Sequence, residues 1–334
     1  MSGPAPAVAG CRLAVRRELA ALDPGATVMV ACSGGADSLA LLAAAVFERR
    51  SGALRVVGAV VDHGLQEGSE AHTAHVVEQM AALGVDETAA IRVTVDAGPG
   101  GVEAGAREAR YVALAQLAEH VGAELVLLGH TLDDQAETVL LGLTRGSGGR
   151  SIAGMRRAFE SGGVVFARPF LEVTRTQTEE ACRAEGIVWW SDPHNADPRF
   201  VRSRIRHAVL PVLERELGPG VAAALARTAV SVRADVDALD DEAELALEGA
   251  RREGGWDVAR LAALGGVPAV QTRVLRLIAL EAGALASDLT RDQVLALADL
   301  LIGPDEGRQI QLPGHLTASR ESNLLRFRRT GESG

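Results

Sequence analysis

Short apolar runs recur along the first half of this chain, separated by segments with helical periodicity. Each run is nearly continuous in aliphatic residues, as expected of parallel strands buried on both faces. The predicted strands are Val28–Cys32, Leu54–Val61, Ile91–Val95, Leu125–Leu128 and Val164–Ala167. The predicted helices between them are Leu39–Glu48, Glu70–Leu83, Val102–Val121 and Leu132–Leu143. This alternation predicts an α/β fold with a doubly wound parallel sheet of about five strands.

The character of the chain changes after Gly218-Pro219-Gly220. Residues 199–217 have the pattern of a helix interrupted by Pro211. Residues 221–301 are rich in Ala and Leu without strand alternation, which predicts helices, and a tail to residue 327 has strand character. At 334 residues the chain is long enough for two domains. We therefore predict a first domain at residues 1–217, including a linker helix, and a smaller, mainly helical domain at residues 218–334.

The basic residues of the chain are unusual because all 34 are arginine. The formal net charge of −10 would ordinarily argue against a nucleic-acid partner, so local clusters of arginine matter more than the total. No apolar run has the length of a membrane span, and the N-terminus lacks the pattern of a secretory signal. We therefore expect a cytoplasmic protein with no membrane partner.

Three cysteines, Cys11, Cys32 and Cys182, are scattered along the sequence. They show no C-x-x-C pair and no zinc-ligand spacing. This pattern argues against a disulfide framework and against a metal cluster.

Residues 33–38 have the sequence SGGADS and stand between a predicted strand and a predicted helix. Two adjacent glycines let the backbone turn tightly and present its N–H groups to an anion, and Ser33 and Ser38 add hydroxyl donors at a helix N-terminus. The G-x-x-x-x-G-K-[ST] pattern is absent, so cleavage between the β and γ phosphates is not the first expectation. The run predicts a loop that binds pyrophosphate. A purely structural turn is the alternative.

Two carboxylates, Asp134 and Glu137, begin the predicted helix that follows Gly129-His130. They are three residues apart and so project from one helix face, where they suit an ammonium or a magnesium ion. The alternative is a capping box between Thr131 and Asp134, with both acids complementing the helix dipole. The nearby phosphate loop and His130 favour the binding interpretation.

Arginine clusters follow in three places. Arg107 and Arg110 lie on one helical face and suit a phosphate, although the spacing alone favours an ordinary pair between Glu103 and Arg107 on an exposed helix. The other two clusters suit phosphodiester contacts, and a solvated helix face is their alternative. Their members are Arg145, Arg150, Arg156 and Arg157 in the first, and Arg199, Arg202, Arg204, Arg206 and His207 in the second.

Taken together, these motifs resemble the tRNA(Ile)-lysidine synthetases, a bacterial family of the PP-loop ATP pyrophosphatase superfamily. The motifs, in the family's order, are SGGADS, VVDHGL, AREARY, GHTLDDQAETVLLGLTRGSGG, RPFLEVTR and DPHNADPRFVRSRIRHAVLP. They cover most of residues 27–211. Gln66 departs from the family, which commonly has Arg there, and puts one positive contact in doubt. The resemblance implies an adenine nucleotide alpha hydrolase-like fold and, after Gly220, a helical tRNA-binding domain.

The resemblance also implies an activity, an ATP-dependent ligation of free L-lysine to carbon 2 of the wobble cytidine in tRNA(Ile) with a CAU anticodon. An adenylated cytidine would form with release of pyrophosphate, and the ε-amine of lysine would then displace AMP. The product, lysidine, would make the tRNA read AUA and accept isoleucine. ATP would be the co-substrate, with Mg²⁺. Whether two chains form a homodimer stays open.

The family's functional residues carry over to this sequence position by position. The catalytic residues would be Asp37, Arg110, Asp134, Glu137 and Arg202. The ATP-binding residues would be Ser33, Gly34, Gly35, Ala36, Asp37, Ser38, Arg110 and His130. Lysine would be bound by Asp134, Glu137 and Arg202, and the metal by Asp37 and Asp134. The tRNA-binding residues would be Arg145, Arg150, Arg199, Arg204 and Arg206.

Two other functions fit part of the pattern. A PP-loop tRNA thiolase would use the same adenylation, but it normally needs paired cysteines, which this sequence lacks. A nucleotide-binding regulatory module without catalysis would explain the loop. It would leave the Asp134/Glu137 pair and the arginine clusters without a role.

Overall fold

The computed structural model describes residues 3–62, 64, 68–93, 101–146, 148–191, 197–303 and 307–330. It divides into two compact units, residues 1–233 and 234–334. The division falls inside helix α10 (Val221–Ala250), which begins shortly after the predicted boundary at 217/218. That boundary therefore stays a proposal. In the described parts of the chain no helix is long and apolar enough to cross a membrane.

A sheet forms the centre of the first unit. Within the described residues it has six strands in the order β3-β2-β1-β4-β6-β5, and every pair is parallel except β5 with β6. The strands are β1 (Thr27–Ala31), β2 (Arg55–Asp62), β3 (Glu87–Arg92), β4 (Leu125–Leu128), β5 (Ala158–Ser161) and β6 (Val164–Ala167). The order reverses at β1, so the crevice beyond the carboxyl ends of β1 and β4 is where a doubly wound sheet binds its ligand.

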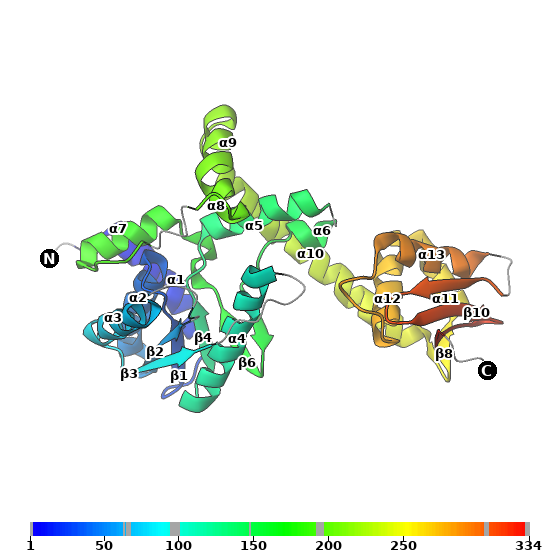
Figure 1. The fold of residues 1–334 in the computed structure, drawn as a ribbon, viewed down its shortest axis with the longest axis horizontal. Coiled ribbons are helices and arrows are strands. Elements are labelled where there is room, and N and C mark those ends of the chain that lie inside the picture. Colours follow the sequence, from blue (N-terminus) through cyan, green and yellow to red (C-terminus); the bar gives the residue numbers. More distant parts are fainter. Residues whose placement is uncertain are drawn as a thin grey trace. The chain divides into compact units, whose positions relative to one another are not determined.

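Helices cover both faces of this sheet (Figure 1). Along β1, Val28 and Val30 pack into the core formed with α1, α2 and α7, whereas Met29 packs into the core formed with α4. The helices of this unit are α1 (Pro6–Leu19), α2 (Ala36–Gly52), α3 (Ser69–Ala82), α4 (Gly101–Val121), α5 (Leu132–Arg145), α6 (Gly149–Ile152) and α7 (Arg175–Glu185), with a 3-10 turn at Pro169–Glu172. The predicted doubly wound α/β fold is confirmed.

Individual elements differ from the prediction in ways that have local causes. The strand expected at Ile91–Val95 begins earlier, at Glu87, because its first two residues are polar and only two alanines follow before Ile91, so no strong aliphatic run marks the start of this edge strand. The antiparallel β5 was not predicted, since only Ala158 and Phe159 of its four residues are apolar. Residues 94–95 lie outside the described part of the chain.

The helix expected at residues 199–217 is continuous through Pro211. It runs as α8 (Val201–Arg204), a π-helical turn (Ile205–Val209) and α9 (Leu210–Leu217), with Pro211 in the first turn of α9. Proline has no N–H to bond the preceding turn, and the widened π turn before it relieves that loss. The predicted interruption was therefore wrong, and a local widening replaces it.

The second unit combines helices with an antiparallel sheet. Its described helices after α10 are α11 (Val258–Ala263), α12 (Pro268–Glu281) and α13 (Arg291–Ile302), with a 3-10 turn at Leu264–Gly266. Its described strands, in the order β7-β8-β11-β10-β9, are β7 (Arg251–Arg252), β8 (Gly255–Asp257), β9 (Gln309–Leu312), β10 (Leu316–Glu321) and β11 (Leu324–Arg329). The predicted strands of the tail are confirmed. The prediction that residues 221–301 lack strands was wrong, because β7 and β8 form a short hairpin that pairs with β11.

Candidate active site

The loop between β1 and α2 is shaped by two glycines. Gly34 has φ +81°, and a Cβ at this position would lie 2.8 Å from Cγ2 of Val76 on α3. Only glycine meets both the backbone conformation and this close approach. Gly35 is the N-cap of α2 and no side chain caps it, so the N–H groups at the start of α2, which follows β1, are left for a ligand. This geometry is the one required of an anion-binding loop.

Hydroxyl groups brace the same loop from within. Ser38 is buried; its hydroxyl accepts a hydrogen bond from the Ser33 N–H at 3.1 Å and donates to the Gly35 carbonyl at 2.9 Å. The Ser33 and Ser38 hydroxyls lie 3.4 Å apart. Ala36, also buried, begins α2. The loop is thus already folded for its ligand, which lowers the entropic cost of binding.

Two aromatic residues without a predicted role, Trp190 and His72, hold the loop from outside. The backbone N–H of Trp190 donates to the Gly34 carbonyl at 3.0 Å, and the ring Nε2 of His72 lies 3.1 Å from the Ser33 carbonyl oxygen. The two rings lie 4.1 Å apart between centroids. Neither residue belongs to a recognisable motif, so only the tertiary structure reveals this contact.

Asp37 lies in the first turn of α2, and its carboxylate accepts a hydrogen bond from the Thr178 hydroxyl on α7. Nε of Arg175 lies 3.5 Å from Oδ2 of the same carboxylate. Burial raises the pKa of Asp37 to about 6, although Arg175 and Thr178 both pull it down. A raised pKa means that the charged form of Asp37 is incompletely stabilised by its neighbours, so this carboxylate favours binding a further cation.

The loop after β4 packs directly against α2. A Cβ at Gly129 would lie within 3.2 Å of the Asp37 carbonyl group, so glycine lets the two segments meet. Next to it, burial lowers the pKa of His130 to about 3, helped by the positive charges of nearby arginines and opposed by the negative charge of Asp134. The imidazole is therefore neutral at physiological pH, and within the described residues its buried Nδ1 has no hydrogen-bond partner.

The two acids of α5, Asp134 and Glu137, show features of both alternatives considered from the sequence, a capping box and a site for a cation. The Thr131 N–H donates to Oδ2 of Asp134 at 2.8 Å and the Thr131 hydroxyl does so at 2.9 Å, which is a capping interaction. The other oxygen of Asp134 contacts arginines, and Glu137 beside it has no exposed surface. The capping bonds to Oδ2 therefore orient Asp134 and leave Oδ1 to contact positively charged groups.

Three arginines from two separate segments meet these acids. Arg206, on the π turn, places Nε 2.7 Å from Oε1 of Glu137 and Nη2 3.3 Å from Oδ1 of Asp134. Arg202, on α8, lies 3.8 Å from Glu137 and donates to the Thr138 hydroxyl at 3.4 Å. Arg175, at the start of α7, lies 2.9 Å from Asp134. Burial raises the pKa of Asp134, but Arg175, His130 and Arg206 together hold it below its ordinary value.

The predicted site residues thus separate into a partly buried cluster and an exposed set. The cluster contains Asp37, Asp134, Glu137, Arg202 and Arg206, and Arg175 joins its phosphate-loop acid to the acid pair. Arg110 lies near His130, as its effect on that pKa indicates. Arg206, predicted to contact tRNA, lies instead on the acid pair. The sequence analysis gave no role to Arg175 and Thr178, although Arg175 ends the RPFLEVTR motif.

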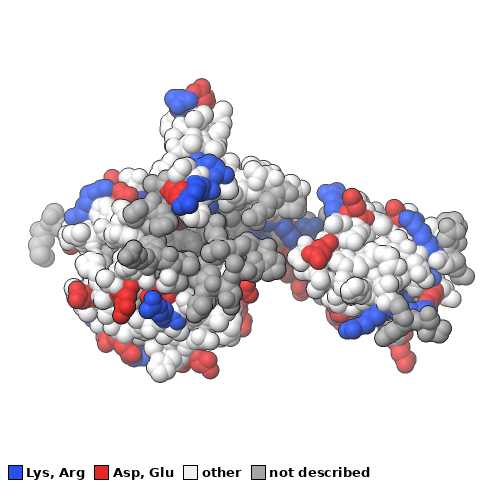
Figure 2. Space-filling view, in the orientation of Figure 1, with Lys and Arg blue, Asp and Glu red and all other residues white. Residues whose placement is uncertain are grey.

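The exposed set lies mainly around α8, where arginine side chains gather on the face drawn in Figure 2. Arg199 pairs with Asp197 at 2.6 Å, and Arg204 donates to the carbonyl of Pro198 at 2.7 Å. Arg150 is exposed on α6. The side chain of Arg145, residues 63 and 65 of the second motif, residues 66–67 after it, and residues 192–196 of the last motif lie outside the described part of the structure.

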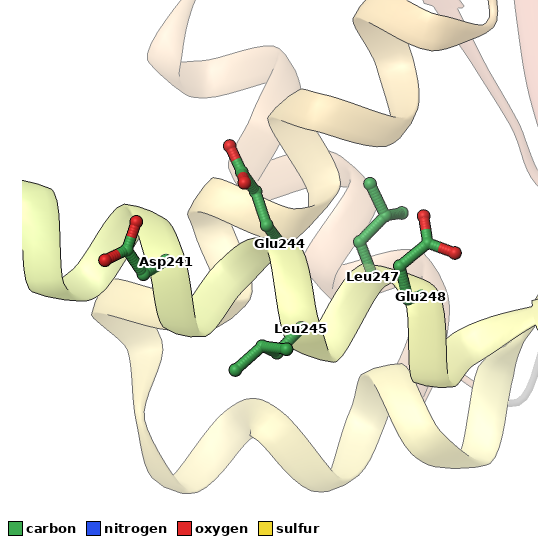
Figure 3. A pocket seen from close by; sticks show the side chains of 5 residues that line it. All are labelled: Asp241, Glu244, Leu245, Leu247 and Glu248. Atoms are coloured by element: carbon green, nitrogen blue, oxygen red, sulfur yellow. The ribbon is translucent and has the colours of Figure 1, made fainter.

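A hollow of about 560 Å³ lies along α10 in the second unit (Figure 3). The residues that line it are Asp241, Glu244, Leu245, Leu247 and Glu248. Its three carboxylates disfavour a phosphate backbone. Because none of the predicted site residues lines this hollow, we assign it no part in the chemistry.

The fold and the phosphate loop without lysine define a protein of the PP-loop class. A family model described as a PP-loop domain matches residues 13–213, and one described as the TilS substrate binding domain matches residues 257–330. A solved structure, the U34-tRNA thiolase NcsA from Methanococcus maripaludis with its [4Fe-4S] cluster, shares the fold. Its TM-score is 0.56 at 16% identity, over 68% of this chain and 78% of that one.

Curated relatives identify the family more narrowly. The tRNA(Ile)-lysidine synthases of Salinispora arenicola and Thermobifida fusca are 50% and 51% identical to this chain, over 97% of its length and 97% and 98% of their own. That of Streptomyces coelicolor is 47% identical over 98% of this chain and 99% of its own. The chain belongs to the tRNA(Ile)-lysidine synthase family.

Proposed function

We propose that this protein ligates free L-lysine to carbon 2 of the wobble cytidine of tRNA(Ile) with a CAU anticodon, at the expense of ATP. The names of its relatives support tRNA(Ile)-lysidine synthase activity. The observation that carries the proposal is the cluster itself. Asp37 of the phosphate loop and the acids Asp134 and Glu137 contact one guanidinium, so a nucleotide site and an amine site adjoin.

In the first step the oxygen on carbon 2 of the cytidine attacks the α-phosphorus of ATP. The bond between the α-phosphorus and the bridging oxygen breaks, pyrophosphate leaves, and an adenylated cytidine forms. The N–H groups at the start of α2 and the hydroxyl of Ser33 would bind the pyrophosphate, and Arg110 would neutralise charge that develops on the phosphates.

In the second step the ε-nitrogen of lysine attacks carbon 2 of the cytidine. The bond from carbon 2 to oxygen breaks and AMP leaves with that oxygen. The lysine ammonium must first lose a proton, and a carboxylate beside it supplies both recognition and an acceptor. Asp134 and Glu137 suit this role because their carboxylates lie side by side, the pKa of Asp134 is held below its ordinary value, and Glu137 has no exposed surface.

The residues also fit a magnesium ion. Asp37 and Asp134 flank the Arg175 guanidinium, so their oxygens already converge on a cation. Magnesium typically takes one or two carboxylates together with substrate phosphates, and among the described residues no larger group of His, Cys, Asp and Glu is arranged as a metal site. The ion would neutralise charge on the phosphates as pyrophosphate leaves.

The tRNA would bind through the exposed arginines and the second unit. Arg199 and Arg204 are exposed around α8, next to the segment that carries Arg202 and Arg206 into the acid cluster. Residues 257–330 match the TilS substrate binding domain. Contacts between arginine side chains and the phosphate backbone would position the RNA, while the cluster of acids and arginines would act on one base. A homodimer remains a proposal that oligomeric-state measurements would test.

The alternative of a tRNA thiolase is disfavoured by the cysteines. Burial raises the pKa of Cys11 and Cys182 to about 12 and also raises that of Cys32, so all three are thiols at neutral pH. Sulfur transfer requires a thiolate. A non-catalytic nucleotide-binding module would not need acids buried beside the phosphate loop.

The proposed function is tested by transfer of radiolabelled lysine to RNA. Purified protein, ATP, Mg²⁺ and labelled lysine are incubated with transcripts of tRNA(Ile) bearing CAU or of tRNA(Met). The label should enter tRNA(Ile) alone, and only with ATP. Absence of transfer to tRNA(Ile) across a range of salt concentrations would contradict the proposal.

A further inference from the structure

Arg175 is fixed in place by its own backbone. It begins α7, where Thr174 and Gln177 form a capping box, and its N–H donates to Oδ2 of Asp133 at 2.8 Å. The side chain is about one-fifth exposed, whereas the backbone is anchored to α5. The guanidinium can therefore move by rotation about its side-chain bonds while its origin stays still.

The guanidinium of Arg175 touches the acids of both predicted sites. Its Nε lies 3.5 Å from Asp37, on the nucleotide side. Its Nη2 lies 2.9 Å from Asp134 and its Nη1 lies 3.7 Å from Glu137, on the amine side. An arginine presents several donors in a planar fork, so one side chain can serve two places at once.

The carboxylates of this cluster are already paired before any substrate arrives. Those of Asp37, Asp134 and Glu137 each contact a guanidinium group, from among Arg175, Arg202 and Arg206. The lysine ammonium must therefore compete with a guanidinium for the same carboxylate oxygens. We expect one guanidinium to withdraw as the ammonium binds.

Arg175 is the guanidinium best placed to withdraw. If Arg175 moved away, Glu137 would still contact Arg206 at 2.7 Å. Asp134 would still contact Arg206 at 3.3 Å and would still accept the capping hydrogen bonds from Thr131. On the other side, the phosphates of ATP offer Arg175 a stronger acceptor than a shared carboxylate, and a metal ion at Asp37 would repel it.

We propose that Arg175 is a positioning residue that couples the nucleotide site to the lysine site, by occupying the place of the lysine ammonium until ATP draws it away. The inference rests on the proposed function. It predicts that nucleotide strengthens lysine binding and, by thermodynamic reciprocity, that lysine strengthens nucleotide binding by the same factor. Lysine would therefore bind weakly to a site that holds no nucleotide.

Calorimetry measures this coupling directly. L-lysine is titrated into the full-length protein with and without Mg²⁺ and an ATP analogue that resists cleavage between the α and β phosphates. For the wild type we expect affinity for lysine to rise about tenfold or more with nucleotide. In Arg175→Gln, lysine should bind tightly without nucleotide, and the coupling factor should fall to about one. Arg183→Gln, on the same helix in an exposed pair with Glu179, should behave as wild type.

A second variant, Arg175→Lys, tests the inference if Arg175→Gln does not fold. Arg175→Lys keeps one positive charge among the acids, but its single ammonium cannot serve Asp37 and Asp134 together, so its coupling should also fall. The inference is overturned if either folded variant keeps the wild-type coupling factor, or if the wild type shows none. Labelled-lysine transfer, measured on the same preparations, separates the outcomes, because an active wild type without coupling contradicts this inference alone.

Discussion

Nε of Arg206 lies 2.7 Å from Oε1 of Glu137, a carboxylate with no exposed surface. The π-helical turn at Ile205–Val209 carries this arginine, and α5 carries the acid. Taking both charges out of water is expensive, and their attraction offsets that cost only while the pair is intact. The pair therefore orients the acid rather than adding much net stability.

Arg206→Met should destabilise the protein by about 3 kcal/mol, because Glu137 would keep a buried charge and lose its nearest cation. Urea denaturation at pH 7 measures the change. Arg183→Met removes an exposed pair with Glu179 and should cost less than about 0.5 kcal/mol. Adding Glu137→Gln to Arg206→Met should restore part of the loss. Similar small effects for Arg206→Met and Arg183→Met would mean that the buried pair is not formed.

Gly34→Ala should weaken ATP binding and lower stability by about 2 kcal/mol, since a Cβ there has both a positive φ and a clash with Val76. Gly25→Ala is the matched control. Gly25 has φ +92°, but nothing lies within 4 Å of its added Cβ. Nucleotide titration and denaturation of both variants separate the clash from the backbone strain. Equal ATP affinity in the two variants would argue against a nucleotide at this loop.

The raised pKa of Asp37 predicts a pH dependence. Because this pKa is about 6 in the folded protein and 3.8 ordinarily, the carboxyl's contribution to stability is complete below pH 3.8 and is lost as the pH rises through 6. ATP–Mg²⁺ binding needs the ionised form, so the affinity of wild type relative to Asp37→Asn should fall several-fold between pH 7.5 and 5. Dividing the affinity of the wild type by that of Asp37→Asn removes the effect of ATP protonation, which is the same for both proteins. A ratio that is constant or grows on acidification would contradict the role of Asp37.

The exposed arginines predict a salt dependence of tRNA binding. If Arg204 contacts a phosphate, Arg204→Ala should reduce the slope of log affinity against log salt concentration by about 0.7 to 0.9. Arg17→Ala, an exposed position on α1 paired with Glu172 at 3.8 Å, should leave the slope unchanged. Filter binding at several salt concentrations measures both. A slope in Arg204→Ala equal to that of wild type would assign Arg204 to a solvated helix face.

Most of the first unit could be predicted because its central strands are continuous apolar runs. Val28, Val56 and Val126 are fully buried on one face of the sheet or the other, and that is the pattern that sequence shows best. The hairpin of β7 and β8 could not be predicted in this way. Its five residues include Arg251, Arg252 and a glycine, and it exists because Trp256 pairs with Leu325, a contact far along the chain.

The site was predicted only where chemistry follows a local motif. The phosphate loop and the spacing of Asp134 and Glu137 are visible in the sequence, and so is the capping by Thr131. Arg175 is 38 residues beyond Glu137, and nothing local shows that its side chain bridges two sites. Long-range ion pairs of this kind depend on where α7, which packs against α1 and α2, places the start of its chain relative to α5, and no periodicity in the sequence shows this.

On the proposed function, the phosphate loop binds the ATP that activates the RNA base, and the acid pair then binds the amine that attacks it. ATP labelled at the α-phosphate, incubated with tRNA(Ile) and Mg²⁺ in the absence of lysine, should transfer the label to the tRNA. Added lysine should release that label as AMP in the wild type, and much more slowly in Asp134→Asn. A label that forms on lysine instead of tRNA, or no labelled RNA before AMP appears, would contradict the account.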